Sequence, residues 1–219
     1  MKSVTLDDLK KNPACNTLIM QADNYLAALG YTEHGFRHAN LVANIATNIF
    51  KRLGKPDRET ELAGIAGYLH DLGNLCGREG HPAIGAVLAY QILSSMGMET
   101  GEITKIMVAI GNHDEPTGFP ASDITSAVIL ADKSDIHRSR VRLQDRSKFD
   151  IHDRVNYAVT NSFLRVSPPE ITMELAVDTS IGSVMDYFEI SFERLVMCRK
   201  AAEFLGCTFH LDINNMRIW

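Results

Sequence analysis

A histidine and an aspartate stand side by side at the end of an apolar segment, and this pair limits what the chain can fold into. The segment runs from Glu61 to Leu69 and is followed directly by His70 and Asp71. Within a hydrophobic helix these two side chains are costly to bury unless they are paired or coordinated. Both offer lone pairs to a divalent metal, and a carboxylate can bridge two ions. The fold therefore has to bring partners to this pair.

Signals that begin and end helices recur along the first 140 residues. Pro13 after Asn12, for example, is typical of an N-cap followed by proline at the first helical position. The predicted helices are a short one after Thr5, one from Asn12 to Gly30, one from Thr32 to Leu53, one over about 58–71, one from His81, one over about 102–112, and one capped by Ser122. Positions 32–140 therefore indicate five helices of an all-α bundle.

The last seventy residues follow a different pattern. Apolar residues alternate with mostly polar ones over 171–177, which predicts a strand. A helix is expected over about 180–205, and a hairpin around Asn214 and Asn215. We expect a mainly α fold, with a helical metal-binding domain over residues 1–150 and a small α+β region over 151–219. The charged stretch from Arg138 to Arg154 is the expected link.

Composition excludes several classes of partner. The net charge of −5 argues against a nucleic-acid polymer, which selects a basic surface. Four cysteines without CxxC spacing fit reduced thiols in the cytoplasm. No apolar run approaches the roughly 20 residues of a membrane span, and the N-terminus lacks the apolar region of a signal peptide. We expect a cytoplasmic protein that does not bind membranes.

Further residues able to bind a metal lie at or near the ends of the predicted helices. His34 and His38 are four residues apart, which would place them on one helix face. The others are His81, His113 with Asp114, and Asp132. Helix ends are positions from which several helices of a bundle can direct side chains into one cavity.

The order His38, His70-Asp71, Asp132 resembles the H…HD…D signature of the HD-domain superfamily of metal-dependent phosphohydrolases. The resemblance covers about residues 34–140 and implies the helical HD-domain bundle. His81 and His113 extend it to the six-ligand pattern of some branches. It implies one metal on His38, His70, Asp71 and Asp132, with Asp71 bridging to a second metal on His81 and His113. His34 is a further candidate ligand. Ligands of this kind fit Fe, Mn, Zn, Co or Ni.

Two branches of the superfamily are similar to this chain. The HD-GYP type resembles the segments around His113 and Phe119, although Asn112, Phe119 and Asn74 replace its histidine, tyrosine and lysine. The diadenosine tetraphosphate hydrolase type resembles the segment around Asp132, which Arg138 and Arg140 follow closely. The substrate stays open between them.

The resemblance implies hydrolysis of a phosphomonoester or phosphodiester of a small molecule or nucleotide by metal-activated water. Two metals of this kind polarise a phosphoryl oxygen and supply the nucleophile. Asp71 is expected to be central. Asp114 or Asp135 is expected to protonate the leaving group or to act on the attacking water. The candidates for phosphate binding are Arg78, Lys133, Arg138 and Arg140.

Two alternatives remain at the level of sequence. Some relatives with the same six ligands hold a di-iron centre and are oxygenases. A non-catalytic module that binds a metal or nucleotide for signalling is the other. Residues 151–219 could cover the pocket, pair two subunits as a homodimer, or stabilise the bundle.

Overall fold

The computed structural model describes residues 3–115 and 117–219. The helices are α1 (Leu6–Lys10), α2 (Pro13–Ala28), α3 (Phe36–Arg52), α4 (Asp57–Leu69), α5 (His81–Ser95), α6 (Thr100–Gly111), α7 (Asp123–Lys133), α8 (Ile151–Ala158) and α9 (Val184–Phe204), with the short 3-10 helices η1 (Leu72–Cys76), η2 (Arg138–Arg140) and η3 (Arg146–Lys148). The strands are β1 (Val159–Ser167), β2 (Glu170–Val177), β3 (Thr208–Ile213) and β4 (Met216–Arg217). The fold is mainly α with a C-terminal α+β part, as the sequence predicts.

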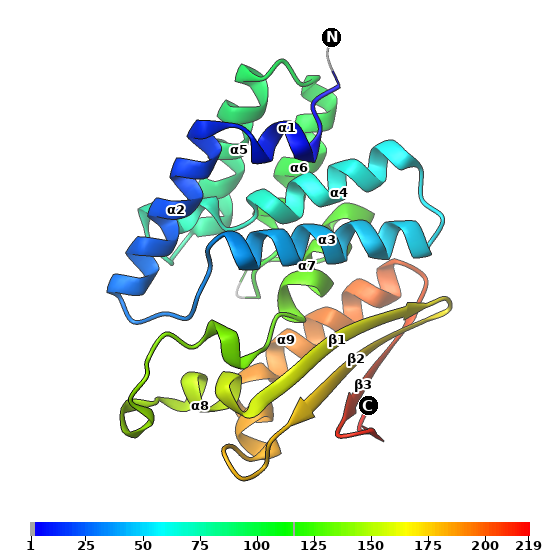
Figure 1. Cartoon of the computed structure of the whole chain (residues 1–219). Helices are drawn as coiled ribbons and strands as arrows, with labels where there is room; N and C mark the ends of the chain where they lie inside the picture. The colour runs from blue at the N-terminus through cyan, green and yellow to red at the C-terminus, as the bar shows by residue number, and fades with distance from the viewer. Residues whose placement is uncertain (1–2, 116) are drawn as a thin grey trace.

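Helices α1 to α7 form one part of the molecule, and the sheet with α8 and α9 forms the other (Figure 1). Helix α4 is buried along nearly its whole length because it packs against α3, α6 and α7. At Gly67 a Cβ atom would lie only 3.1 Å from the backbone of Ala43. The absence of a side chain there lets α3 and α4 approach closely, and this approach brings His38 next to His70.

The turn after α4 depends on a second close approach. Gly73 lies in η1, and a Cβ there would collide with the carbonyl oxygen of His81 and lie 2.6 Å from the Gly85 nitrogen. A glycine therefore allows η1 to lie directly against the start of α5, which positions His81 near the end of α4.

The sheet of the described chain has the order β1-β2-β3-β4. Strands β1 and β2 are antiparallel, while β2 and β3 are parallel and joined by α9. Asn214 and Asn215 have positive φ angles of 51° and 64° in the turn to β4, which confirms the predicted hairpin. Helix α9 packs against both β3 and α7, so the buried apolar side chains form one cluster across both parts. The division at residue 150 stays a prediction.

Two expectations about the elements are wrong or incomplete. The helix predicted from Thr32 begins at Phe36, with Gly35 as its N-cap. Residues 32–35 form a loop, where the His34 Nδ1 lies 2.7 Å from the Thr32 carbonyl oxygen. His34 and His38 therefore do not share a helix face. The sequence interpretation also missed α8 and β1 beside the predicted strand. No helix in the described parts of the chain has both the length and the apolarity needed to cross a membrane.

Candidate metal centre

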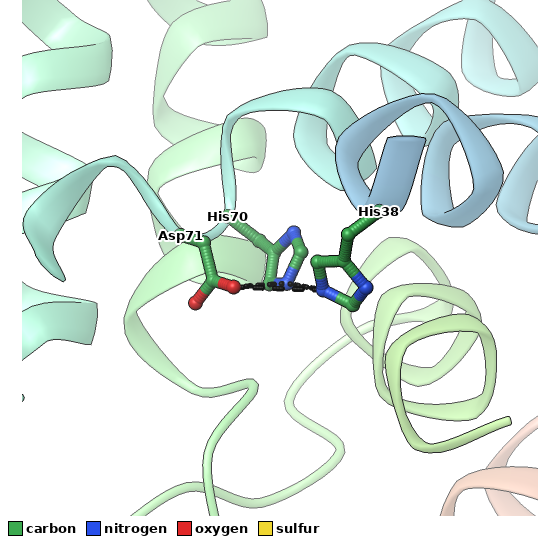
Figure 2. Close-up of side chains that lie close together, drawn as sticks. All are labelled: His38, His70 and Asp71. Atoms are coloured by element: carbon green, nitrogen blue, oxygen red, sulfur yellow. Dashed lines mark hydrogen bonds and ion pairs between the residues drawn. The ribbon is translucent and has the colours of Figure 1, made fainter. Parts of the chain in front are cut away.

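Three helices bring four potential ligand atoms together. His38 comes from α3, His70 and Asp71 follow α4, and Asp132 lies near the end of α7. The His38 Nε2 lies 3.2 Å from the His70 Nε2, 3.5 Å from the Asp71 Oδ2 and 3.3 Å from the Asp132 Oδ1. Figure 2 shows the His38, His70 and Asp71 side chains directed at one point. The four ligands predicted for the first metal thus lie together inside the bundle.

A second group of ligand atoms faces the other oxygen of Asp71. The Asp71 Oδ1 lies 3.4 Å from the His81 Nε2 and 3.9 Å from the His113 Nε2. These two histidine nitrogens are 3.2 Å apart. Asp71 therefore directs one oxygen to each group, as the bridging role implied by the resemblance requires.

The other nitrogen of each histidine ring fixes the ring for this purpose. The Nδ1 atoms of His70, His81 and His113 lie 2.7–2.9 Å from the backbone carbonyl oxygens of Gly67, Arg78 and Ile110. A carbonyl oxygen can only accept, so each Nδ1 carries the proton and each Nε2 presents a lone pair. Such partners are typical of metal-binding histidines.

The convergence of these acceptors fits a cation. The histidine Nε2 lone pairs face carboxylate oxygens, and the buried Asp71 Oδ2 accepts no hydrogen bond within the described residues. Separations of 3.2–3.6 Å in the first group suit ligands about 2.0–2.2 Å from a common ion. Ligand atoms lie within 4.8 Å of one another in three groups, which are His38 with His70 and Asp71, His70 with His113 and Asp132, and Asp71 with His81 and His113.

Without a metal, the cluster binds protons in its place. Burial and the charge of Arg140 lower the pKa of His38, but the carboxylates of Asp132, Asp135 and Asp71 outweigh them and raise the pKa to about 10. Burial also lowers the pKa of His70, but the negative charge of Asp71 outweighs this effect and raises the pKa to about 9. The pKa values of Asp71 and Asp132 lie well below the usual range although burial raises them, because the histidines and, for Asp132, Lys133 stabilise the carboxylates.

The histidines of the second group have the opposite shift. Burial lowers the pKa of His113, and the charges of His70 and Lys133 lower it further. Burial is also the largest cause of the lowered pKa of His81. Both rings are therefore neutral and available as ligands near neutral pH.

Lys133 lies among carboxylates. Its Nζ is 2.8 Å from the Asp132 Oδ2, 2.8 Å from the Glu115 Oε2 and 3.6 Å from the Asp114 Oδ1. The predicted phosphate-binding ammonium is therefore held by three acidic side chains, and its direct effect is to position Asp132. Glu115 was not among the residues singled out from the sequence, although it follows Asp114 directly.

Asp135 lies behind His38. Its Oδ2 is 2.6 Å from the His38 Nδ1, and Arg37 donates to both of its oxygens at 3.1 and 2.8 Å. The carboxylate is buried and faces the ring nitrogen that points away from the ligand cluster. Asp135 is thus placed to orient His38, and its role in proton transfer stays a prediction.

The remaining candidates divide between the site and its surroundings. The Arg78 guanidinium lies 3.4 Å from the Asp114 Oδ1 and 3.7 Å from the Asp71 Oδ1. Arg140 is buried and donates to the Asp135 carbonyl oxygen at 2.8 Å. Arg138 instead lies over the Tyr157 ring, 5.3 Å from its centre, so the structure does not bring it to the cluster. His34 stacks edge-on against His38, with ring centres 5.4 Å apart, as a neighbour of the first group.

One residue of the site could not be identified from the sequence. Arg194 in α9 forms an ion pair with Glu115 at 2.6 Å. It also lines a small cavity of about 30 Å³ together with Asp132, Arg78, Arg140 and His34. No motif surrounds it, and only the packing of α9 against α7 brings it there.

Comparison with known proteins agrees with this geometry. Residues 35–138 match the family model of the HD domain. This range contains His38, His70, Asp71, His81, His113 and Asp132 and excludes the C-terminal α+β part. The match confirms the resemblance at the level of the HD domain, while the branch stays a prediction.

Two proteins are similar over a longer range. An uncharacterized protein of Methanocaldococcus jannaschii is 31% identical over 171 residues, which is 67% of this chain and 65% of that protein. The chain thus spans about two thirds of the length of that relative. The crystal structure of a predicted HD superfamily hydrolase from an uncultured Thermotogales bacterium aligns with 22% identity and a TM-score of 0.43, over 61% of this chain and 75% of that chain.

Proposed function

We propose that the protein is a metal-dependent phosphohydrolase that cleaves a phosphomonoester or phosphodiester bond of a small molecule or nucleotide. One observation carries the proposal. Ligand atoms of four histidines and two aspartates converge beside a cavity lined by arginines. The acceptors suit a divalent cation, and the arginines suit the phosphate that such a cation would activate.

Two metal positions follow from the two groups of ligands. His38, His70, Asp71 and Asp132 would hold the first metal, and Asp71, His81 and His113 the second. When bound, divalent metals supply Lewis acidity and lower the pKa of coordinated water. The second position is the weaker one, because the Arg78 Nη1 lies only 3.4 Å from the His81 Nε2 and Asn74 donates to the Asp71 Oδ1 at 2.7 Å.

The side chains of the chain itself bind the substrate and move its protons. Arg78 and Arg140 line the small cavity next to Asp132, where a phosphate would lie. Of the two candidates, Asp114 is a better proton donor to a leaving group than Asp135. Burial raises its pKa, although Lys133 and Arg78 act in the opposite direction. Asp135 is already engaged with His38 and two arginines, so it holds no proton to give.

Metal analysis followed by a substrate panel tests the proposal. Freshly purified protein is expected to contain Fe, Mn, Zn, Co or Ni, and to hydrolyse phosphomonoesters or phosphodiesters with that metal. Asp71→Asn removes the charge that both ligand groups share, so it should abolish metal retention and turnover. Asp123→Asn is the matched control, because Asp123 is an exposed partner of Lys55 on the surface.

The proposal fails if metal-loaded wild-type protein hydrolyses no member of the panel, or if Asp71→Asn retains both metal and activity. Oxygen consumption by an iron-loaded protein with an organic substrate would instead identify an oxygenase. Metal-dependent nucleotide binding without turnover would identify a binding module.

A further inference from the structure

The small cavity beside Asp132 gathers positive charge from four parts of the chain. Its cationic side chains are Arg78 before α5, Lys133 at the end of α7, Arg140 in η2 and Arg194 in α9. The carboxylates that contact these four cations outside the metal ligands are Asp114, Glu115 and Asp135. Asp71 and Asp132 also contact Arg78 and Lys133, so four cations face five carboxylates before a metal is bound. A divalent metal on Asp71 and Asp132 would offset the charge of these two ligands, which leaves four cations against three carboxylates.

Two of these arginines stand where larger cavities meet the small one. Arg78 and Arg194 line the small cavity, a cavity of about 900 Å³ and another of about 390 Å³. Arg194 uses its Nε for Glu115 at 2.6 Å. Since a guanidinium carries five N–H donors in a planar fork, its terminal nitrogens remain able to donate to a ligand.

The largest cavity disfavours an anion away from this junction. Its lining includes Glu79, Glu189 and Glu193 beside the aromatic rings of Tyr31 and Phe192. The acidic groups repel phosphate, whereas the rings can pack against an organic group. A phosphate next to the one at Asp132 is therefore confined to the arginines, and the rest of the molecule extends into the large cavity.

Building on the proposed function, we propose that Arg194, with Arg78 and Arg140, forms a subsite for a second phosphate group. The enzyme then selects molecules with two linked phosphates over those with one. Because Arg194 comes from α9, this subsite also gives residues 151–219 a direct part in the site. Without α9, the junction would retain Arg78 and Arg140 but lose Arg194, one of the two arginines that line all three cavities.

Isothermal titration of the metal-saturated full-length protein tests the subsite without turnover. The probes are methylenediphosphonate, a diphosphate that cannot be hydrolysed, and inorganic phosphate, with the metal content checked after each titration. Wild type should bind the diphosphonate more tightly than phosphate. Arg194→Gln should raise the Kd of the diphosphonate about ten-fold and that of phosphate less than about two-fold, as expected for one lost charge-assisted contact.

Arg199→Gln is the matched control on the same helix. Arg199 lies 5.2 Å from the centre of the Trp219 ring and pairs with Glu203, so neither Kd should change. Arg194→Lys keeps a charge opposite Glu115 and serves if the glutamine variant does not fold. A lysine lacks the planar fork that lets arginine pair with Glu115 and donate to a phosphate at the same time. Arg194→Lys should therefore also weaken diphosphonate binding.

The subsite is refuted if Arg194→Gln changes both Kd values equally or neither, if Arg199→Gln gives the same loss, or if Arg194→Lys binds the diphosphonate as wild type does. Its failure can be told from that of the proposed function. Diphosphonate selectivity that depends on Arg194, without hydrolysis of any phosphoester, would leave the subsite standing and refute the hydrolase. Phosphoester hydrolysis together with a diphosphonate selectivity that Arg194→Gln does not change would support the hydrolase and refute the subsite.

Discussion

Asp135→Asn should weaken metal binding although Asp135 is not a proposed ligand. Asp135 accepts the Nδ1 proton of His38 at 2.6 Å and so fixes the ring that presents Nε2 to the first metal position. Loss of such a partner typically costs about 10- to 100-fold in metal affinity, or about 1.4–2.7 kcal/mol. Asparagine has nearly the same volume, so packing around the site should change little.

The same substitution should also destabilise the metal-free protein. Arg140 is buried and 3.7 Å from the Asp135 carboxylate, so its charge would lose its closest anion. Arg37 loses one of two hydrogen bonds, but its side chain is 36% exposed and water compensates in part. We expect a loss of about 2–3 kcal/mol in the free energy of unfolding, below the full cost of an isolated buried charge.

Competition with a chromophoric chelator measures the metal Kd, and urea unfolding in EDTA measures the stability. Asp123→Asn is the control for both, since its exposed pair with Lys55 should contribute less than about 1 kcal/mol and should leave the metal Kd unchanged. A metal Kd for Asp135→Asn within about three-fold of wild type would refute the orienting role of Asp135.

Other perturbations test the packing, the titration and the metal linkage. Gly73→Ala should destabilise the protein by at least about 1–3 kcal/mol in urea unfolding, because its Cβ meets the start of α5. Gly111→Ala, where a Cβ meets no described atom within 4 Å, should be neutral or slightly stabilising. Burial raises the pKa of Cys15 and of Tyr68 to about 12, so the unfolded chain loses these protons first. The contribution of these groups to stability is therefore complete below about pH 9 and declines as the pH rises toward 12, which urea unfolding in EDTA at increasing pH would show; a flat profile would contradict it. Exposed Cys76 should react with a thiol reagent at pH 8 while buried Cys15 does not, as mass spectrometry of the native protein can show. Metal at 100 times its Kd should raise the free energy of unfolding by about 2.7 kcal/mol, and EDTA should reverse the shift in thermal melts.

Local signals were sufficient for much of the fold. Asn12 caps α2 with Pro13 at its start, Ser122 caps α7, and Asn214 and Asn215 make the turn of the last hairpin. Each of these depends on the conformational preferences of a few neighbouring residues. The helix predicted from Thr32 failed for the same reason, because Thr32 is a good N-cap by itself while the loop is held by tertiary contacts. The Glu33 backbone, for example, is bonded to the Arg140 carbonyl oxygen at 2.9 Å.

Partners distant in the sequence were harder to predict. The six proposed ligands were implied by the resemblance to the HD-domain signature, and helix ends were only the positions at which such residues were expected to meet. The parallel pairing of β2 with β3 requires the whole of α9 as a crossover, and no short pattern specifies it. Arg194 could not be recognised as a site residue for the same reason, because its position at the site depends on which helix α9 packs against.

Ion pairs link the C-terminal part to a proposed metal ligand. The Asp132 Oδ2 contacts Lys133 at 2.8 Å, Lys133 contacts the Glu115 Oε2 at 2.8 Å, and the Glu115 Oε1 contacts Arg194 at 2.6 Å. Burial opposes the charge on Glu115, yet Lys133 and Arg194 lower its pKa to about 2. Removing one member of this partly buried series leaves its neighbour without a compensating charge. The charge that holds Asp132 in place is thus balanced in part from α9, so a change in the C-terminal part should reach the metal ligand without contacting it.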